Sequence, residues 1–124
     1  MSDMELFKET LLDLPKEFNG SLDFISPIVR FVNAIFYLAV KNEAEVVVLY
    51  KNELFFQTQE LVPFIKLSAV EVQILNYRVL QMGRMQEDQT SGVISNFNVG
   101  GKIINVHVYL DQESLSLTLS PVLQ

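Results

Sequence analysis

The chain has 124 residues, of which 49% are hydrophobic, and it carries a net charge of −6. This length fits a single domain, and this hydrophobic content excludes intrinsic disorder. The negative charge argues against nonspecific binding to nucleic acid or to anionic lipid, because both require a positive surface. The chain has no Cys and one His, which excludes disulfides, thiolate metal sites and histidine-rich zinc sites.

No targeting segment is recognisable in the sequence. Residues 1–5 are acidic where a secretory signal peptide would be basic. The most apolar run, residues 27–40, is interrupted by Arg30 and Asn33 and is shorter than the roughly 20 residues that a membrane-spanning helix needs. We therefore expect a cytoplasmic protein without membrane insertion.

Two helices are predicted in the first third of the chain. Apolar residues recur at three- and four-residue spacing over residues 4–14, which predicts an amphipathic helix that docks either on the domain or on a partner. Ser26 as N-cap and Pro27 in the first turn predict a second helix that ends near Lys41. This second helix is apolar on most sides, so we expect it at the centre of the core.

The middle of the chain predicts a hairpin followed by a helix. Residues 45–50 and 53–58 read as strands joined by a two-residue turn. Ser68 and Glu71 have the spacing of a capping box, which favours a helix over residues 70–82. Apolar residues also alternate at the start of that segment, and a strand is the alternative there.

The last third predicts a second hairpin. Gly100-Gly101 forms a two-residue turn between strands over residues 93–99 and 102–110. An uninterrupted register from this turn puts Val93 on the apolar, core-facing side and Ile94 opposite His107 on the polar side.

A third strand over residues 115–120 alternates leucines with hydroxyl residues and completes a three-stranded meander. The element order predicts an α+β fold, with an antiparallel sheet of about five strands made of the first hairpin and this meander. Two main helices should pack on one face of the sheet. We expect an N-terminal helical arm over residues 1–20 and a single α+β domain over residues 21–124.

The sequence offers no catalytic, cofactor or metal site. It contains neither a G-x-x-x-x-G-K-[ST] phosphate loop nor a G-x-G-x-x-G motif. No second titrating group is placed near His107, and Glu87 and Asp88 lie in a polar loop without the spacing of metal ligands. We therefore expect a protein that is not an enzyme and that binds no cofactor or metal ion.

Three stretches of the chain follow a pattern of motifs that occurs in one protein family. Residues 26–35, SPIVRFVNAI, are similar to the P-[IV]-V-x-[LF]-V-N-x-[IL] helix of that family. Residues 44–51, AEVVVLYK, stand where the family has an A-S-D-I-H-[IF]-E-P strand. Residues 91–94, SGVI, and 99–103, VGGKI, follow the order of the family's polar R-x-P-Q-D-G-R loop, strand, glycine pair and strand. Together the three stretches resemble the domain that precedes the ATPase core in type II secretion and type IV pilus assembly ATPases. The resemblance covers roughly residues 26–120 and implies the same fold.

Departures from the family pattern limit what the resemblance implies about activity. The family's Asp and His on the first strand fall at Val46 and Val48, and the arginine after the loop glycine falls at Val93. No nucleotide-related residue is carried over, and the sequence holds no phosphate loop. The resemblance therefore implies the fold and the packing against neighbouring subunits, without ATP hydrolysis.

The first hairpin supplies a candidate interaction surface. Its turn pairs Val48 with Phe55, and both faces of the hairpin are apolar, so both should be buried. One face should pack on the helices. The other, made of Val46, Val48, Tyr50 and Phe55, is covered either by the N-terminal helix or by a protein partner.

These observations predict a non-catalytic protein-interaction or regulatory module related to the N-terminal region of a secretion or pilus ATPase. It would act by self-association, as a homodimer, or by docking on a secretion-type ATPase. The alternative is a small acidic chaperone for a secreted protein, which the size, the acidity and the apolar sheet would also suit.

Overall fold

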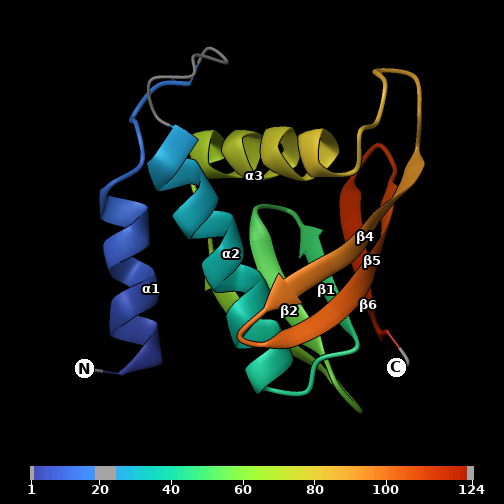
Figure 1. Ribbon diagram of the computed structural model, residues 1–124. Coiled ribbons are helices and arrows are strands. Elements are labelled where there is room, and N and C mark those ends of the chain that lie inside the picture. The colour runs from blue at the N-terminus through green and yellow to red at the C-terminus, as the bar shows by residue number, and fades with distance from the viewer. Residues whose placement is uncertain (1, 19–24, 123–124) are drawn as a thin grey trace.

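The computed structural model describes residues 2–18 and 25–122, which form three helices and one sheet (Figure 1). The helices are α1 (Asp3–Leu12), α2 (Ile25–Lys41) and α3 (Ala69–Met82). The strands are β1 (Val46–Tyr50), β2 (Glu53–Gln57), β3 (Leu61–Lys66), β4 (Ser91–Val99), β5 (Lys102–Leu110) and β6 (Ser114–Pro121). The predicted α+β class is confirmed.

All six strands form one antiparallel sheet in the order β3-β2-β1-β6-β5-β4. Two meanders therefore lie side by side and meet where β1 pairs with β6. The sheet curves around α2, and α3 lies across one end of it (Figure 1). The predicted sheet of about five strands lacks β3, whose Pro63 is unusual within a strand. Pro63 is tolerated here because β3 is an edge strand.

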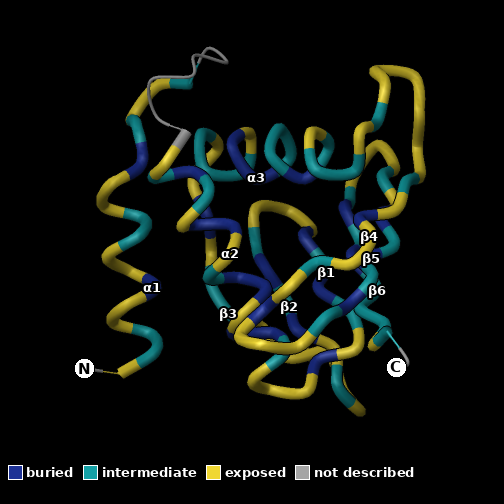
Figure 2. Tube along the Cα trace, viewed as in Figure 1, coloured by how far each residue is buried: buried dark blue, intermediate teal, exposed yellow. Residues whose placement is uncertain are grey.

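The core lies between the helices and one face of the sheet, where the buried segments face each other in Figure 2. Phe31 and Phe36 of α2 are fully buried, and Phe36 packs edge-on against Phe97 of β4. On the sheet, the inward-facing residues of β1 and β2 are buried: Val47, Leu49, Leu54 and Phe56. The apolar α2 therefore occupies the central position that its composition predicts.

The helix boundaries follow the capping signals with one exception. At α3 the Ser68 side chain accepts from the Glu71 backbone N–H, while the Glu71 carboxylate accepts from the Ser68 N–H, so the predicted capping box is confirmed. The segment is a helix, and the strand alternative is wrong. The structure starts α2 at Ile25, so Ser26 lies inside the first turn instead of serving as the N-cap. Its predicted end at Lys41 is confirmed.

The hairpin registers are confirmed near their turns and wrong beyond a bulge in β4. Val99 lies opposite Lys102 as predicted, but two residues, Ser95 and Asn96, bulge where one would fit. Asn96 adopts a φ of 53°, and its N–H donates to the side-chain oxygen of Asn105. This bulge exchanges the faces of the β4 residues that precede it in the chain, compared with the register predicted from the turn.

Because of the bulge, Val93 lies opposite His107, and Ile94 lies opposite Val106. Ile94 is 6% exposed and joins the core, whereas Val93 is 45% exposed on the other face. Both assignments reverse the prediction. The shift places the larger apolar side chain in the core and leaves the smaller one at the edge of the sheet.

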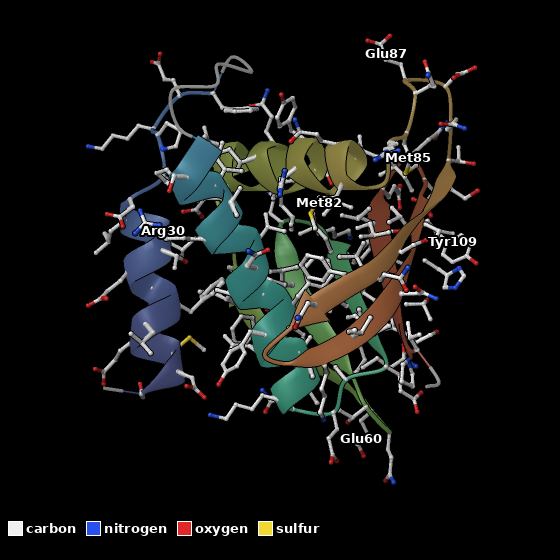
Figure 3. All side chains as sticks on the ribbon, in the orientation of Figure 1. Arg30, Glu60, Met82, Met85, Glu87 and Tyr109 are labelled. Atoms are coloured by element: carbon white, nitrogen blue, oxygen red, sulfur yellow. The ribbon has the colours of Figure 1, made fainter. Side chains whose placement is uncertain are left out.

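Helix α1 docks on the helical side of the sheet. The Phe7 ring lies 5.8 Å from that of Phe31 and 5.2 Å from that of Phe64 of β3. Ion pairs join Asp13 to Arg30 at one end of α1 and Asp3 to Lys41 at the other (Arg30 is labelled in Figure 3). The contact with Asp3 raises the pKa of Lys41, first through the hydrogen bond and then through the opposite charge.

Candidate functional site

The predicted interaction residues lie together on the sheet face that points away from the helices. Val46, Val48 and Tyr50 alternate with the buried residues of β1, and Val48 lies opposite Phe55 of β2. Because side chains alternate between the two faces of a strand, all four predicted residues share one face. We call it the open face, because none of the helices in the described part of the chain lies on it (Figure 1).

The N-terminal helix does not cover this face. Phe7 of α1 packs against Phe64, whose ring stacks on that of Phe56 at 4.6 Å, and Phe56 points into the core. Helix α1 therefore lies on the opposite side of the sheet from Val48. The interpretation in which the N-terminal helix buries the second apolar face of the hairpin is wrong.

Strand β6 brings a row of hydroxyl groups beside the apolar residues. Val48 lies opposite Ser116, and Val46 lies opposite Thr118. The row continues along the open face with Ser114 and Ser120. The sequence analysis recognised the alternation in this strand but did not place it next to β1, because a pairing between strands about 70 residues apart leaves no local signal in the sequence.

Strand β5 extends the open face with Tyr109 and His107, which lie opposite Ser116 and Thr118. Tyr109 is 53% exposed, and its side chain points away from the helices in Figure 3. The open face thus grades from apolar residues on β1 and β2, through hydroxyls on β6, to aromatic and polar residues on β5.

The centre of the open face carries no charge. Val48 is surrounded by Phe55, Ser116 and its own neighbours on β1, while Glu53 lies at the edge opposite Lys66. Tyr50 is 38% exposed, and Val46, Val48 and Phe55 are half-buried by their neighbours on the sheet. A neutral surface of this kind loses little solvation when another protein covers it, which suits association.

The open face does not combine the groups of a catalytic centre. His107 lies between Thr118 and Val93 in the sheet, where sequence reasoning placed it beside Ile94. Neither neighbour is a carboxylate that could orient the imidazole. Among the described residues, no group of three or more His, Asp and Glu side chains could hold a metal ion.

Two further hollows lie elsewhere on the molecule. One, of about 450 Å³, lies between α1 and α2 and has Leu6 and Tyr37 in its lining. The other, of about 380 Å³, lies between α3 and the β1–β2 and β5–β6 turns. There Asp111 accepts from the Glu113 and Ser114 N–H groups and the Ser114 hydroxyl, which lowers the pKa of Asp111 and closes the turn.

No family model matches the chain, and no curated protein matches it. Within residues 2–18 and 25–122, none of the helices is long and apolar enough to cross a membrane.

Proposed function

We propose that this protein is a non-catalytic interaction or regulatory module, related to the domain that precedes the ATPase core of secretion and pilus assembly ATPases. It acts in the cytoplasm by docking on a secretion-type ATPase or by self-association. The observation that carries the proposal is the open face, where Val46, Val48, Tyr50 and Phe55 form an apolar, uncharged surface without a helix of the described chain over it.

The order of elements supports the relationship. The chain has helix α2, the first hairpin, helix α3, a polar loop, and two strands around Gly100-Gly101 in the order that the resemblance implies, with β3 as an additional strand between the hairpin and α3. The three positions at which the resembled family carries Asp, His and Arg are Val46, Val48 and Val93, and all three lie on the open face. Replacing three charged or titratable groups by valine on a single face favours contact with protein over contact with a nucleotide.

Substitution of Val48 by Glu tests the proposal. A carboxylate at the centre of the open face would be buried without a partner charge when another protein covers it, which is expensive. We expect Val48→Glu to weaken binding to a secretion-type ATPase, or self-association, by at least about tenfold. Surface plasmon resonance and analytical ultracentrifugation measure the two modes, and circular dichroism checks the fold.

Leu12→Glu is the matched control, because Leu12 is 83% exposed on α1, on the other side of the sheet. It should leave both kinds of association unchanged. Unaltered binding by the Val48→Glu variant, in a chain that stays folded, would remove the open face as the interaction surface.

Titration with nucleotide tests the non-catalytic part of the proposal. We expect no heat of binding with Mg-ATP at micromolar concentration and no release of phosphate, because the sequence holds no phosphate loop and Val46, Val48 and Val93 supply no charge. Isothermal titration calorimetry and a phosphate-release assay give the answer. A micromolar dissociation constant for Mg-ATP would contradict the proposal.

A further inference from the structure

The two edges of the sheet differ in how they are protected against pairing with another strand. Edge strand β3 contains Pro63 and Lys66 and a bulge opposite β2, three devices that block the addition of a strand. Edge strand β4 has nine residues, Ser91–Val99, without a charged residue or a proline. Only its bulge at Ser95 and Asn96 interrupts it.

The first half of β4 presents its backbone outward. The Leu110 N–H donates to the Thr90 carbonyl, so residues 90, 92 and 94 form the hydrogen-bonded pairs with β5. The N–H and C=O groups of Ser91 and Val93 therefore point away from β5, and Ser95 is the first residue of the bulge. In the described chain no strand lies beyond β4, and Ser91, Val93 and Ser95 are exposed.

The sequence of this half-strand is self-complementary under a two-fold axis. With the axis at Val93, an antiparallel second copy places Val93 opposite Val93 and Ser91 opposite Ser95. All outward backbone groups of the segment are then paired, and no like charges meet. The bulge bends the strand after Ser95 and so limits the pairing to residues 91–95.

We propose that two copies of this chain associate edge to edge through residues 91–95 of β4, forming one continuous sheet of twelve strands. The exposed Val93 side chains meet at the two-fold axis on the open face. We assign the edge to a second copy of the chain, because one neutral, self-complementary segment then pairs the outward backbone groups of both strands.

The edge-to-edge dimer also affects how a partner is bound, and this part of the inference rests on the proposed function. A two-fold axis at the edge runs perpendicular to the sheet, so the open faces of both copies point to the same side. The apolar residues around Val48 stay free in such a dimer and are presented twice. Self-association then occurs at the β4 edge, and the open face serves only to dock on a partner. A partner that offers two binding sites would then be bound more tightly than by a single chain, because the second contact forms within the same complex.

Lysine at the edge tests the pairing, and the sheet offers a matched control. Val93 on β4 is 45% exposed, and Val62 on β3 is 48% exposed. Val93→Lys would bring two ammonium groups together at the axis, whereas Val62→Lys adds one cation to the already protected edge. Sedimentation should show a dimer for the wild type and for Val62→Lys, and at least a tenfold higher dimer dissociation constant for Val93→Lys.

Cysteine substitution provides a second measurement that does not depend on how the lysine variant folds. The chain has no Cys, so each single variant carries one thiol. Opposite residues in a hydrogen-bonded antiparallel pair lie about 5.5 Å apart between Cα atoms, within the range that a disulfide spans. Mild oxidation should therefore convert Val93→Cys to a disulfide-linked dimer on a non-reducing gel, and leave Val62→Cys monomeric.

A wild type that stays monomeric up to millimolar concentration overturns the edge pairing, as does equal cross-linking of the two cysteine variants. If Val48→Glu dissociates the dimer and Val93→Lys does not, the chains associate through the open face and the edge proposal is wrong. If Val93→Lys dissociates the dimer while Val48→Glu keeps it, the edge pairing is established. Loss of partner binding by Val48→Glu is read separately and decides the proposed function alone.

Discussion

Replacing Phe7 by Ala should lower the free energy of unfolding by about 3–5 kcal/mol, as truncation of a buried phenylalanine does. Phe7 is 1% exposed, and its ring contacts those of Phe31 and Phe64. Removal of the ring leaves a cavity between α1, α2 and β3 that these neighbouring aromatic residues cannot fill without leaving their own contacts. Urea denaturation followed by circular dichroism measures the change.

Leu12→Ala on the same helix is the control for Phe7→Ala. Leu12 is 83% exposed, so its truncation should change the free energy of unfolding by less than about 1 kcal/mol. Equal, small effects of the two substitutions would contradict the docking of α1 on the core. The docking of α1 would then have to rest on its two exposed ion pairs, which solvent screens strongly.

The docking of α1 shows what the sequence could and could not predict about the site. Helical spacing predicted an amphipathic helix, and its apolar stripe required a surface to pack on. The spacing carries no information about which side of the sheet that surface lies on. The structure places it on the side of Phe31 and Phe64, and this choice leaves Val48 uncovered.

The first hairpin was predictable in detail because its information is local. A two-residue turn fixes the register of both strands, and alternation then fixes which residues share a face. For this reason the sequence alone assigns Val46, Val48, Tyr50 and Phe55 to one surface, and the pairing of β1 with β2 agrees. The hydroxyl row of β6 could not be added to that surface, because the pairing of β1 with β6 depends on the packing of the whole core.

The second hairpin shows the limit of the same reasoning. The turn at Gly100-Gly101 predicted the pairs next to it, down to Phe97 opposite Ile104. A bulge adds one residue to one strand. A prediction that assumes uninterrupted alternation of side chains has no place for this extra residue. The indication in the sequence is Asn96, a residue type that tolerates positive φ, placed between two apolar residues that both belong in the core.

Ile94 and Val93 provide the test of the bulge. With the bulge, Ile94→Ala truncates a buried side chain that is 6% exposed and should lower the free energy of unfolding by about 2–5 kcal/mol. Val93→Ala truncates an exposed side chain and should lower it by less than about 1 kcal/mol. Both are measured by urea denaturation at low protein concentration, so that association of the chains does not contribute to stability.

An uninterrupted register exchanges the faces of these two residues, so it predicts the reverse order of the two effects. A larger loss for Val93→Ala than for Ile94→Ala would therefore restore that register and place Val93 in the core. It would also remove the exposed, neutral edge on which the pairing of two copies depends, because the outward side chain at the two-fold axis would no longer lie at the surface.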